Sequence, residues 1–288
     1  MLGKLLKYEF KSTSRVLWFL YGGLIIVALL LGLIIRANVD LGGLDLMPAG
    51  VQSNQTMGIF MTIVTSAFAL IYFLLIYAII ITTTIVIIMR FYKNMLGGEG
   101  YLMHTLPVKT SSLILSKLIT ACCWMLIAFA VIVVSTLVLG FSSGIITEML
   151  RNTSLREIIG IIRMSFREIG FSGWSFVVLM LISTVSSIMT YYVSMAIGNL
   201  ANNHKFLFSI LAYVGIGIVL SIVLTITSVV SGMQLTNALE YADTDAFTYE
   251  FGRMMNTNVW TAIFTQLAVT VGGFFATNYL LSKKLNLA

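Results

Sequence analysis

The charged residues of this chain are spaced so that six long stretches contain no Asp, Glu, Lys or Arg. These stretches hold 20, 44, 30, 36, 34 and 29 residues, and they lie between Arg15 and Arg36, Asp45 and Arg90, Lys117 and Glu148, Glu168 and Lys205, Lys205 and Glu240, and Arg253 and Lys283. A helix needs about 20 apolar residues to cross roughly 30 Å of hydrocarbon at about 1.5 Å per residue. The spacing therefore predicts six membrane-spanning helices, at 16–35, 59–89, 118–141, 173–198, 206–231 and 259–281.

The composition excludes a water-soluble globular protein. Of the 288 residues, 59% are hydrophobic and only 10% are charged. Soluble domains carry about 25% charged residues, so this chain has too few to cover a surface that faces water. We expect an all-α polytopic membrane protein with one transmembrane domain over residues 1–288.

The distribution of basic residues predicts the orientation. Six spans place both chain ends on one side of the membrane. If that side is the cytoplasm, the inside segments are 1–15, 90–117, 199–205 and 282–288, which hold 11 of the 17 basic residues and only the acidic residues Glu9 and Glu99. Cytoplasmic loops are enriched in Lys and Arg, so we expect a multi-pass protein of the cell membrane with both termini cytoplasmic. The outer segment 142–172 departs from this pattern, because it contains four arginines.

The N-terminal residues 2–15 have the pattern of an amphipathic helix. Apolar residues gather on one side and basic residues on another: Leu2, Leu5, Leu6 and Phe10 against Lys4, Lys7, Lys11 and Arg15. This arrangement is typical of an interfacial helix in the headgroup layer, basic where it meets anionic lipid. Ordinary basic residues flanking the first span are the alternative interpretation.

Two outer segments are expected to be helical. In 142–172, Ser154 and Glu157 form an S-x-x-E capping box ahead of apolar residues at helical spacing, which predicts a helix on the outer leaflet or over the bundle. Its role could be structural or could involve substrate. The second segment, 232–258, is acidic, and it could be a solvated loop, a first contact for a cationic substrate or, least favoured by its ligand spacing, a metal site.

The sequence contains no readable catalytic or cofactor site. It has no G-x-x-x-x-G-K-[ST] phosphate-binding loop, and His104 and His204 have no partner at metal-ligand spacing. Cys122 and Cys123 are neighbours in a predicted helix, which excludes an ordinary disulfide between them. The predicted spans contain no Asp, Glu, Lys, Arg or His, whereas ion-coupled carriers usually need such groups at membrane depth. We therefore expect no enzyme activity, no cofactor and no nucleic-acid partner, and an energy source elsewhere for any uphill transport.

Hydroxyl side chains form a row on the fourth predicted span. Ser183, Ser187, Thr190 and Ser194 recur at helical spacing, and Gly198 follows one turn later. Small residues on one helix face allow a neighbouring helix to approach closely. Helix packing is the favoured interpretation of this row, and lining of a translocation path is the alternative.

The segment 90–117, after the second predicted span, is the most distinctive part of the sequence: RFYKNMLGGEGYLMHTLPVKTSSLILSK. Gly97, Gly98 and Gly100 are expected to end the helix of the span. A short helical turn can follow and end at Pro107, because the residue before proline avoids the α region. Thr110 or Ser111 can then cap a helix that continues through Lys117 into the third span.

The order of residues in this segment resembles the six-span permease subunits of type-2 ABC exporters. Those permeases have a Glu, then Gly-x-Leu, a short apolar stretch, Pro-Val and a Lys entering the third span. The corresponding residues here are Glu99, Gly100, Tyr101, Leu102, Pro107, Val108 and Lys117, with Met103 and Leu106 in the stretch between. The form EGYLMHTLPV is similar to the small permeases of Gram-positive bacteria, and the amphipathic N-terminus and helical outer segments also match that family.

The resemblance implies a function. In that family the segment is a coupling helix that sits in a groove of a separate ATP-binding subunit, and two such subunits, which hold ATP and Mg, assemble with two permeases. It implies that this chain is a non-catalytic bacterial permease subunit that pairs with a second copy or a homologue within membrane lipid. The expected cargo is a hydrophobic or amphipathic substrate, such as an antimicrobial peptide or a drug. A secondary transporter and a non-transporting scaffold or immunity subunit are the alternatives.

Overall fold

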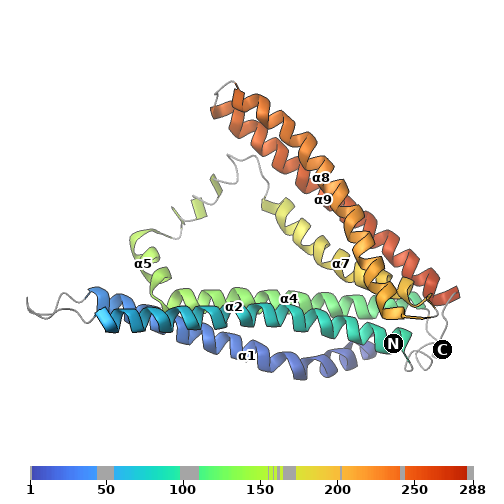
Figure 1. Cartoon of the computed structure of the whole chain (residues 1–288), viewed down its shortest axis with the longest axis horizontal. Coiled ribbons are helices and arrows are strands. Elements are labelled where there is room, and N and C mark those ends of the chain that lie inside the picture. Colours follow the sequence, from blue (N-terminus) through green and yellow to red (C-terminus); the bar gives the residue numbers. More distant parts are fainter. Residues whose placement is uncertain are drawn as a thin grey trace, which may run out of the picture. The chain divides into compact units, whose positions relative to one another are not determined.

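The chain is all-helical in a computed structural model that describes residues 2–43, 55–97, 110–154, 156–157, 159–160, 163–164, 173–201, 203–240 and 244–283 (Figure 1). No strand occurs in these ranges. The helices are α1 (Leu2–Gly43), α2 (Gln55–Phe91), the π-helix η1 (Tyr92–Leu96), α4 (Thr110–Ser142), α5 (Ile145–Asn152), α7 (Gly173–Gly198), α8 (Lys205–Glu240) and α9 (Thr244–Lys283). The predicted all-α class is confirmed.

Six of these helices contain segments that are long and apolar enough to cross a membrane. The candidate spans are Leu17–Asn38, Gly58–Leu96, Thr110–Ser142, Trp174–Gly198, Lys205–Met233 and Tyr249–Ser282. Each overlaps one of the six predicted spans. A helix satisfies every backbone hydrogen bond within its own segment, which is the requirement that hydrocarbon imposes on a spanning chain.

Large apolar side chains cover the outside of the helices rather than filling a central core. Phe19 is 83% exposed, Trp18 69% and Phe206 76%. Such exposure would promote aggregation in water, but it is the normal composition of a surface that faces lipid. The outer surface therefore agrees with the membrane placement inferred from helix length.

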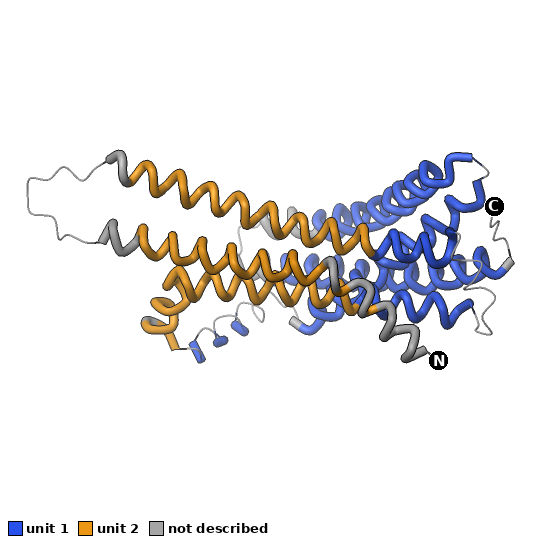
Figure 2. The backbone as a smooth tube through the Cα atoms, turned by 90° about the horizontal axis from the view of Figure 1, so that it is seen from below, with its two compact units in different colours: residues 1–6, 87–122, 156–288 blue, residues 7–86, 123–155 orange. Residues whose placement is uncertain are grey.

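The chain divides into two compact units, which are coloured separately in Figure 2. One unit contains residues 7–86 and 123–155, and therefore most of α1, α2 and α4 together with α5. The other contains residues 1–6, 87–122 and 156–288, and therefore the end of α2, η1, the first part of α4, and α7 to α9. Helices α2 and α4 each continue from one unit into the other.

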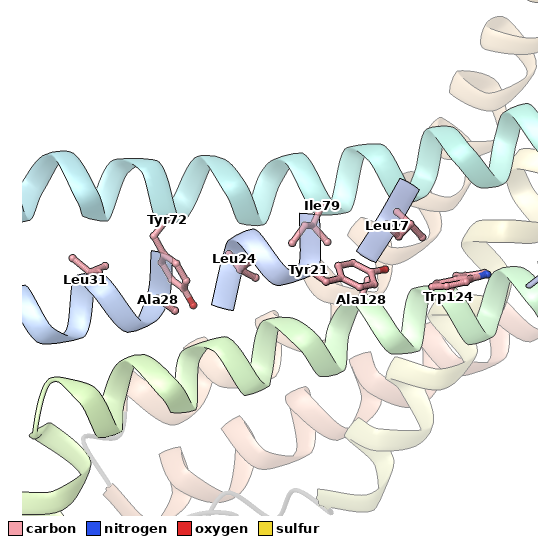
Figure 3. Packing of buried hydrophobic residues seen from close by; sticks show 9 residues of the cluster. All are labelled: Leu17, Tyr21, Leu24, Ala28, Leu31, Tyr72, Ile79, Trp124 and Ala128. Carbon is pink, nitrogen blue, oxygen red and sulfur yellow. The ribbon is translucent and has the colours of Figure 1, made fainter. Parts of the chain in front are cut away.

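The unit of α1, α2 and α4 is held by a row of buried apolar side chains where the three helices meet (Figure 3). The cluster consists of Leu17, Tyr21, Leu24, Ala28, Leu31, Tyr72, Ile79, Trp124 and Ala128. The Tyr72 hydroxyl adds a polar link between α2 and α4, because it lies 3.0 Å from Ser135 Oγ and 3.2 Å from Thr136 Oγ1. Close packing and hydrogen bonds drive helix association in lipid, because lipid tails are as apolar as the side chains.

The same unit ends in a sharp turn between α4 and α5. Gly144 adopts a left-handed backbone conformation, with φ of 83°. Glycine occupies this region without the steric cost that a Cβ would add. Its carbonyl oxygen accepts a hydrogen bond from the Glu148 N–H at 2.9 Å, so the turn leads directly into α5.

The second unit is a bundle in which α7, α8 and α9 pack on one another. Gly273 on α9 lies against α7, where an added Cβ would come within 3.0 Å of Val193 Cγ2. Between α8 and α9, Ser231 Oγ lies 3.3 Å from Asn258 Oδ1. The contacts between these helices thus include a close approach at a small residue and a polar contact, both of which are common between membrane helices.

Two predicted segments prove to be continuous with the neighbouring spans. Residues 2–15 are helical, and α1 continues through them without a break to Gly43, so the position of this part in the headgroup layer stays a prediction. The segment 232–258 is helix up to Glu240 and again from Thr244, as extensions of α8 and α9. In the outer segment 142–172, the described residues 156–157, 159–160 and 163–164 are helical.

Candidate functional site

The predicted coupling residues Glu99, Gly100, Tyr101, Leu102, Met103, Leu106 and Pro107 lie outside the described residues, which stop at 97 and resume at 110. Lys117 is described. What the structure defines is the pair of helix ends that hold this segment. We call the end of α2 together with η1 the first flank, and the first turns of α4 the second flank.

The first flank passes through a π-helix before it ends at glycine. After Phe91 the helix widens into η1, and the Gly97 N–H donates to the Tyr92 carbonyl at 2.8 Å, which closes the π-turn. Gly97 itself is extended, with φ of −89° and ψ of −172°. The prediction that glycine ends the helix after the second span is confirmed at Gly97. Single π-turns inserted in α-helices occur frequently at functional sites.

The first flank is anchored by buried side chains. Phe91 is 1% exposed and stacks on Tyr192 of α7, with ring centroids 3.8 Å apart and planes 11° apart. Met95 and Leu96 of η1 are also buried. The helix end that leads into the segment is therefore fixed to α7 by a closely stacked, buried aromatic pair.

The second flank is buried just as deeply. Leu113 and Ile114 are 2% and 0% exposed in the first turns of α4. Lys117 is 6% exposed, although lysine is almost never fully buried unless it is paired. Lys117 does take part in an interaction in the structure, which agrees with that requirement. The predicted helix from Thr110 through Lys117 into the third span is present as one continuous element.

Both flanks belong to the unit that contains α7, α8 and α9 (Figure 2). Residues 87–97 and 110–122 are part of that unit, whereas the remainder of α2 and α4 belongs to the unit of α1. A displacement of segment 98–109 would therefore act on two helix ends within one compact body. The same two helices connect that body covalently to the other unit.

The hydroxyl row of α7 divides between buried and exposed positions. Thr190 and Ser194 are buried, Ser183 is half-buried and Ser187 is exposed. Each hydroxyl donates to a carbonyl oxygen of its own helix, at distances of 2.7 to 2.9 Å. Their protons are thus committed within α7, so these groups offer acceptor oxygens rather than donors to any neighbour. Lining of a path by the four stays a prediction.

The end of α7 is where a small residue brings two helices together. An added Cβ at Gly198 would come within 2.7 Å of the Lys205 carbonyl oxygen in α8. The intervening turn contains His204 with φ of 57°, a left-handed conformation that is uncommon outside glycine. The helix-packing interpretation of this small-residue row has a structural counterpart at Gly198.

The described residues provide no metal-binding cluster of His, Cys, Asp and Glu. Cys122 and Cys123 are both partly buried, and neither forms a disulfide within the described residues. In the acidic segment, Glu250 Oε1 lies 3.7 Å from Arg253 Nη1, one helical turn away on α9. Exposed pairs of this kind contribute little to stability.

Sequence reasoning missed the π-turn and the partner of Phe91. The π-turn lies at the polar end of the second span, where Lys93 and Asn94 interrupt the apolar sequence. Tyr192 lies in an uncharged apolar stretch, where hydropathy does not distinguish a side chain that faces lipid from one that faces a helix. The sequence does mark where the span ends, because Arg90 and Lys93 begin its polar end and Phe91 lies between them.

No protein-family model, curated protein or solved structure matches this chain.

Proposed function

We propose that this chain is the permease subunit of an ATP-driven exporter of the type-2 ABC class. The observation that carries the proposal is the segment between the second and third spans. Its sequence resembles the coupling helix of those permeases, from Glu99 and Gly100-Tyr101-Leu102 to Pro107-Val108 and Lys117. The burial of both flanks within one unit supports the role, because a coupling element must transmit force to the spans that it joins.

The mechanism follows from how the flanks are held. A partner that moves segment 98–109 pulls on η1, which is anchored by Met95 and by the Phe91–Tyr192 stack, and on α4 at Leu113. Packed helices respond to such a push by shifting as bodies rather than by bending continuously. Motion of α7 to α9 with both flanks would then open or close a path for substrate.

The source of energy is expected on another chain. In the candidate spans, ionisable residues occur towards the ends, as with Arg36, Lys117, Lys205 and Arg253, and the middle turns have none. Carriers driven by protons or ions generally place such groups at membrane depth. Two separate ATP-binding subunits, each with ATP and Mg, would supply this energy, and a second permease copy or homologue would complete the path.

The substrate class that fits best is a hydrophobic or amphipathic molecule, such as a peptide or a drug. The side chains available to line a path are aliphatic, aromatic and hydroxyl groups, among them Ser187 and Thr190. Such groups bind apolar surface well and offer little to a strongly hydrated ion. The acidic residues between 240 and 250 on the predicted outer side would favour a cationic amphiphile.

The proposal is tested by Leu102→Asp in a complex of this chain with the ATP-binding subunit that the proposal requires. A carboxylate buried in a partner groove without a counter-charge costs several kcal/mol, so co-purification or transport-linked ATP hydrolysis should be lost while membrane insertion persists. The matched control is Leu200→Asp, which places the same charge on the exposed turn after α7. If Leu102→Asp assembles and hydrolyses ATP like the parent, the segment is not the coupling element.

A further inference from the structure

A cavity of about 690 Å³ lies within the unit of α7 to α9, close to the first flank. The end of α2 and η1 form one wall, α7 forms the second and the first turns of α8 form the third. This volume is within the range of sites that hold small molecules, about 300–1,000 Å³. Lys117, the described member of the coupling residues, does not line it, so the cavity needs its own explanation.

The walls of the cavity are apolar and open sideways. Phe206 and Ile210 of α8 line it and are 76% and 47% exposed, and Met89 of α2 is 49% exposed. These residues belong to candidate membrane spans, where an exposed side chain faces hydrocarbon rather than water. The cavity therefore opens towards lipid, and an acyl chain can enter it without crossing a polar barrier.

One end of the cavity is cationic. Lys93 of η1 is exposed, lines the cavity and forms no ion pair with any described residue. The two serines in the wall offer no free proton, because Ser194 donates to the Thr190 carbonyl at 2.7 Å and Ser209 donates to the Lys205 carbonyl at 2.9 Å. Lys93 is thus the one charged side chain among the described residues that line the cavity, beside walls that are mostly apolar.

The lining of the cavity is rich in tyrosine, which is typical of the depth of a membrane interface. Tyr92, Tyr191 and Tyr213 line it, and the latter two stack with ring centroids 5.3 Å apart. Tyrosine is enriched at the level of the lipid headgroups. The basic residues of the chain place this end on the cytoplasmic side, and the cytoplasmic leaflet carries the anionic lipids.

We propose that this cavity binds one anionic phospholipid of the cytoplasmic leaflet. An acyl chain would occupy the space between Met89 and Ile210, and the phosphate would lie beside Lys93. The anionic headgroup matches the positive charge of Lys93, and the acyl chain matches the apolar walls. A zwitterionic lipid would match only the walls. The bound lipid would join η1 to α7 and α8, next to the helix end that enters segment 98–109. The inference does not depend on the identity of the ATP-binding partner.

The test uses the full purified chain in detergent and a phosphatidylglycerol that carries a photoactivatable diazirine in one acyl chain. Mass spectrometry should find the label within residues 206–213 or on Met89, and unlabelled phosphatidylglycerol should compete. Ile210→Trp, which fills the cavity, should abolish this labelling. The matched control Ile218→Trp, also exposed on α8 but outside the cavity, should leave it unchanged.

The charge is tested separately with Lys93→Gln. One basic residue near an anionic surface contributes about 1 kcal/mol, which corresponds to about fivefold in affinity. Unlabelled phosphatidylglycerol should therefore compete about fivefold less well in the variant, whereas competition by phosphatidylcholine should not change. Arg151→Gln on α5 removes the same charge from an exposed helix elsewhere and should have no effect. Label spread evenly over exposed apolar residues, or equal competition by both lipids, would overturn the proposal.

Discussion

The stack of Phe91 on Tyr192 should be an energetic link between the end of α2 and α7. The two rings are nearly parallel, with centroids 3.8 Å apart, and both side chains are about 1% exposed. We predict that Phe91→Leu destabilises the protein measurably. The exposed ring of Phe60 on the same helix provides the matched control, Phe60→Leu.

The expected size follows from the geometry. An aromatic pair contributes about 0.5–1.5 kcal/mol beyond the area that it buries, and replacing Phe by Leu in a packed site costs up to about 1.5 kcal/mol. Phe91→Leu should therefore lower the free energy of unfolding by about 0.5–3 kcal/mol. Phe60→Leu should change it by less than about 0.5 kcal/mol, because that side chain faces lipid.

Both changes in the free energy of unfolding can be measured by unfolding the protein with sodium dodecyl sulfate in mixed micelles and monitoring the helix content by circular dichroism. A double-mutant cycle with Tyr192→Leu isolates the stack from the further interaction that Tyr192 makes. The coupling energy should be about 0.5–1.5 kcal/mol. A coupling energy below about 0.3 kcal/mol would refute the link, because distant and independent sites deviate from additivity by that much.

Three further predictions concern packing and topology. Tyr72→Phe removes a buried hydrogen bond between α2 and α4, so it should lower the free energy of unfolding by about 0.6 kcal/mol, and by at most about 1.7 kcal/mol. The control Tyr77→Phe, on the exposed face of α2, should cause no measurable change in the same unfolding assay. Gly273→Val should impair folding or lower the unfolding midpoint because a Cβ there meets α7, whereas Gly272→Val should be tolerated because nothing lies within 4 Å; equal effects would contradict the packing described for α9. Asn286→Cys should resist an impermeant thiol reagent in whole cells if both termini are cytoplasmic, and labelling from outside would reverse the topology.

The spans were predictable from sequence because charge is expensive in hydrocarbon. The gap between Arg15 and Arg36 predicts a span at 16–35, and the structure has an apolar helix over Leu17–Asn38. The ends of the helices were less predictable where a helix continues beyond the apolar span into polar sequence. The last span begins at 259 in the sequence reading, yet α9 begins at Thr244, because polar residues such as Glu250 and Arg253 do not stop a helix in water.

The partners of each helix could not be predicted. In a soluble protein, the apolar face of a helix identifies the side that packs. In these spans both the packed and the lipid-facing sides are apolar, so Phe91, buried against Tyr192, and Phe73, 62% exposed, look alike in the sequence. Small residues gave a partial signal, since Gly198 does lie at a close helix contact. The cavity beside Lys93 had no signal, because it is assembled from three separate segments.

The central claim is that residues 99–107 dock on an ATP-binding subunit, and cross-linking tests it most directly. A photoreactive benzoylphenylalanine at position 102, activated in cells of the native host, should cross-link this chain to a protein that contains a G-x-x-x-x-G-K-[ST] phosphate-binding loop. The same group at position 200, on the turn after α7, should give a much weaker product or none. Cross-links from position 102 to lipid alone, or none to an ATP-binding protein, would contradict the account.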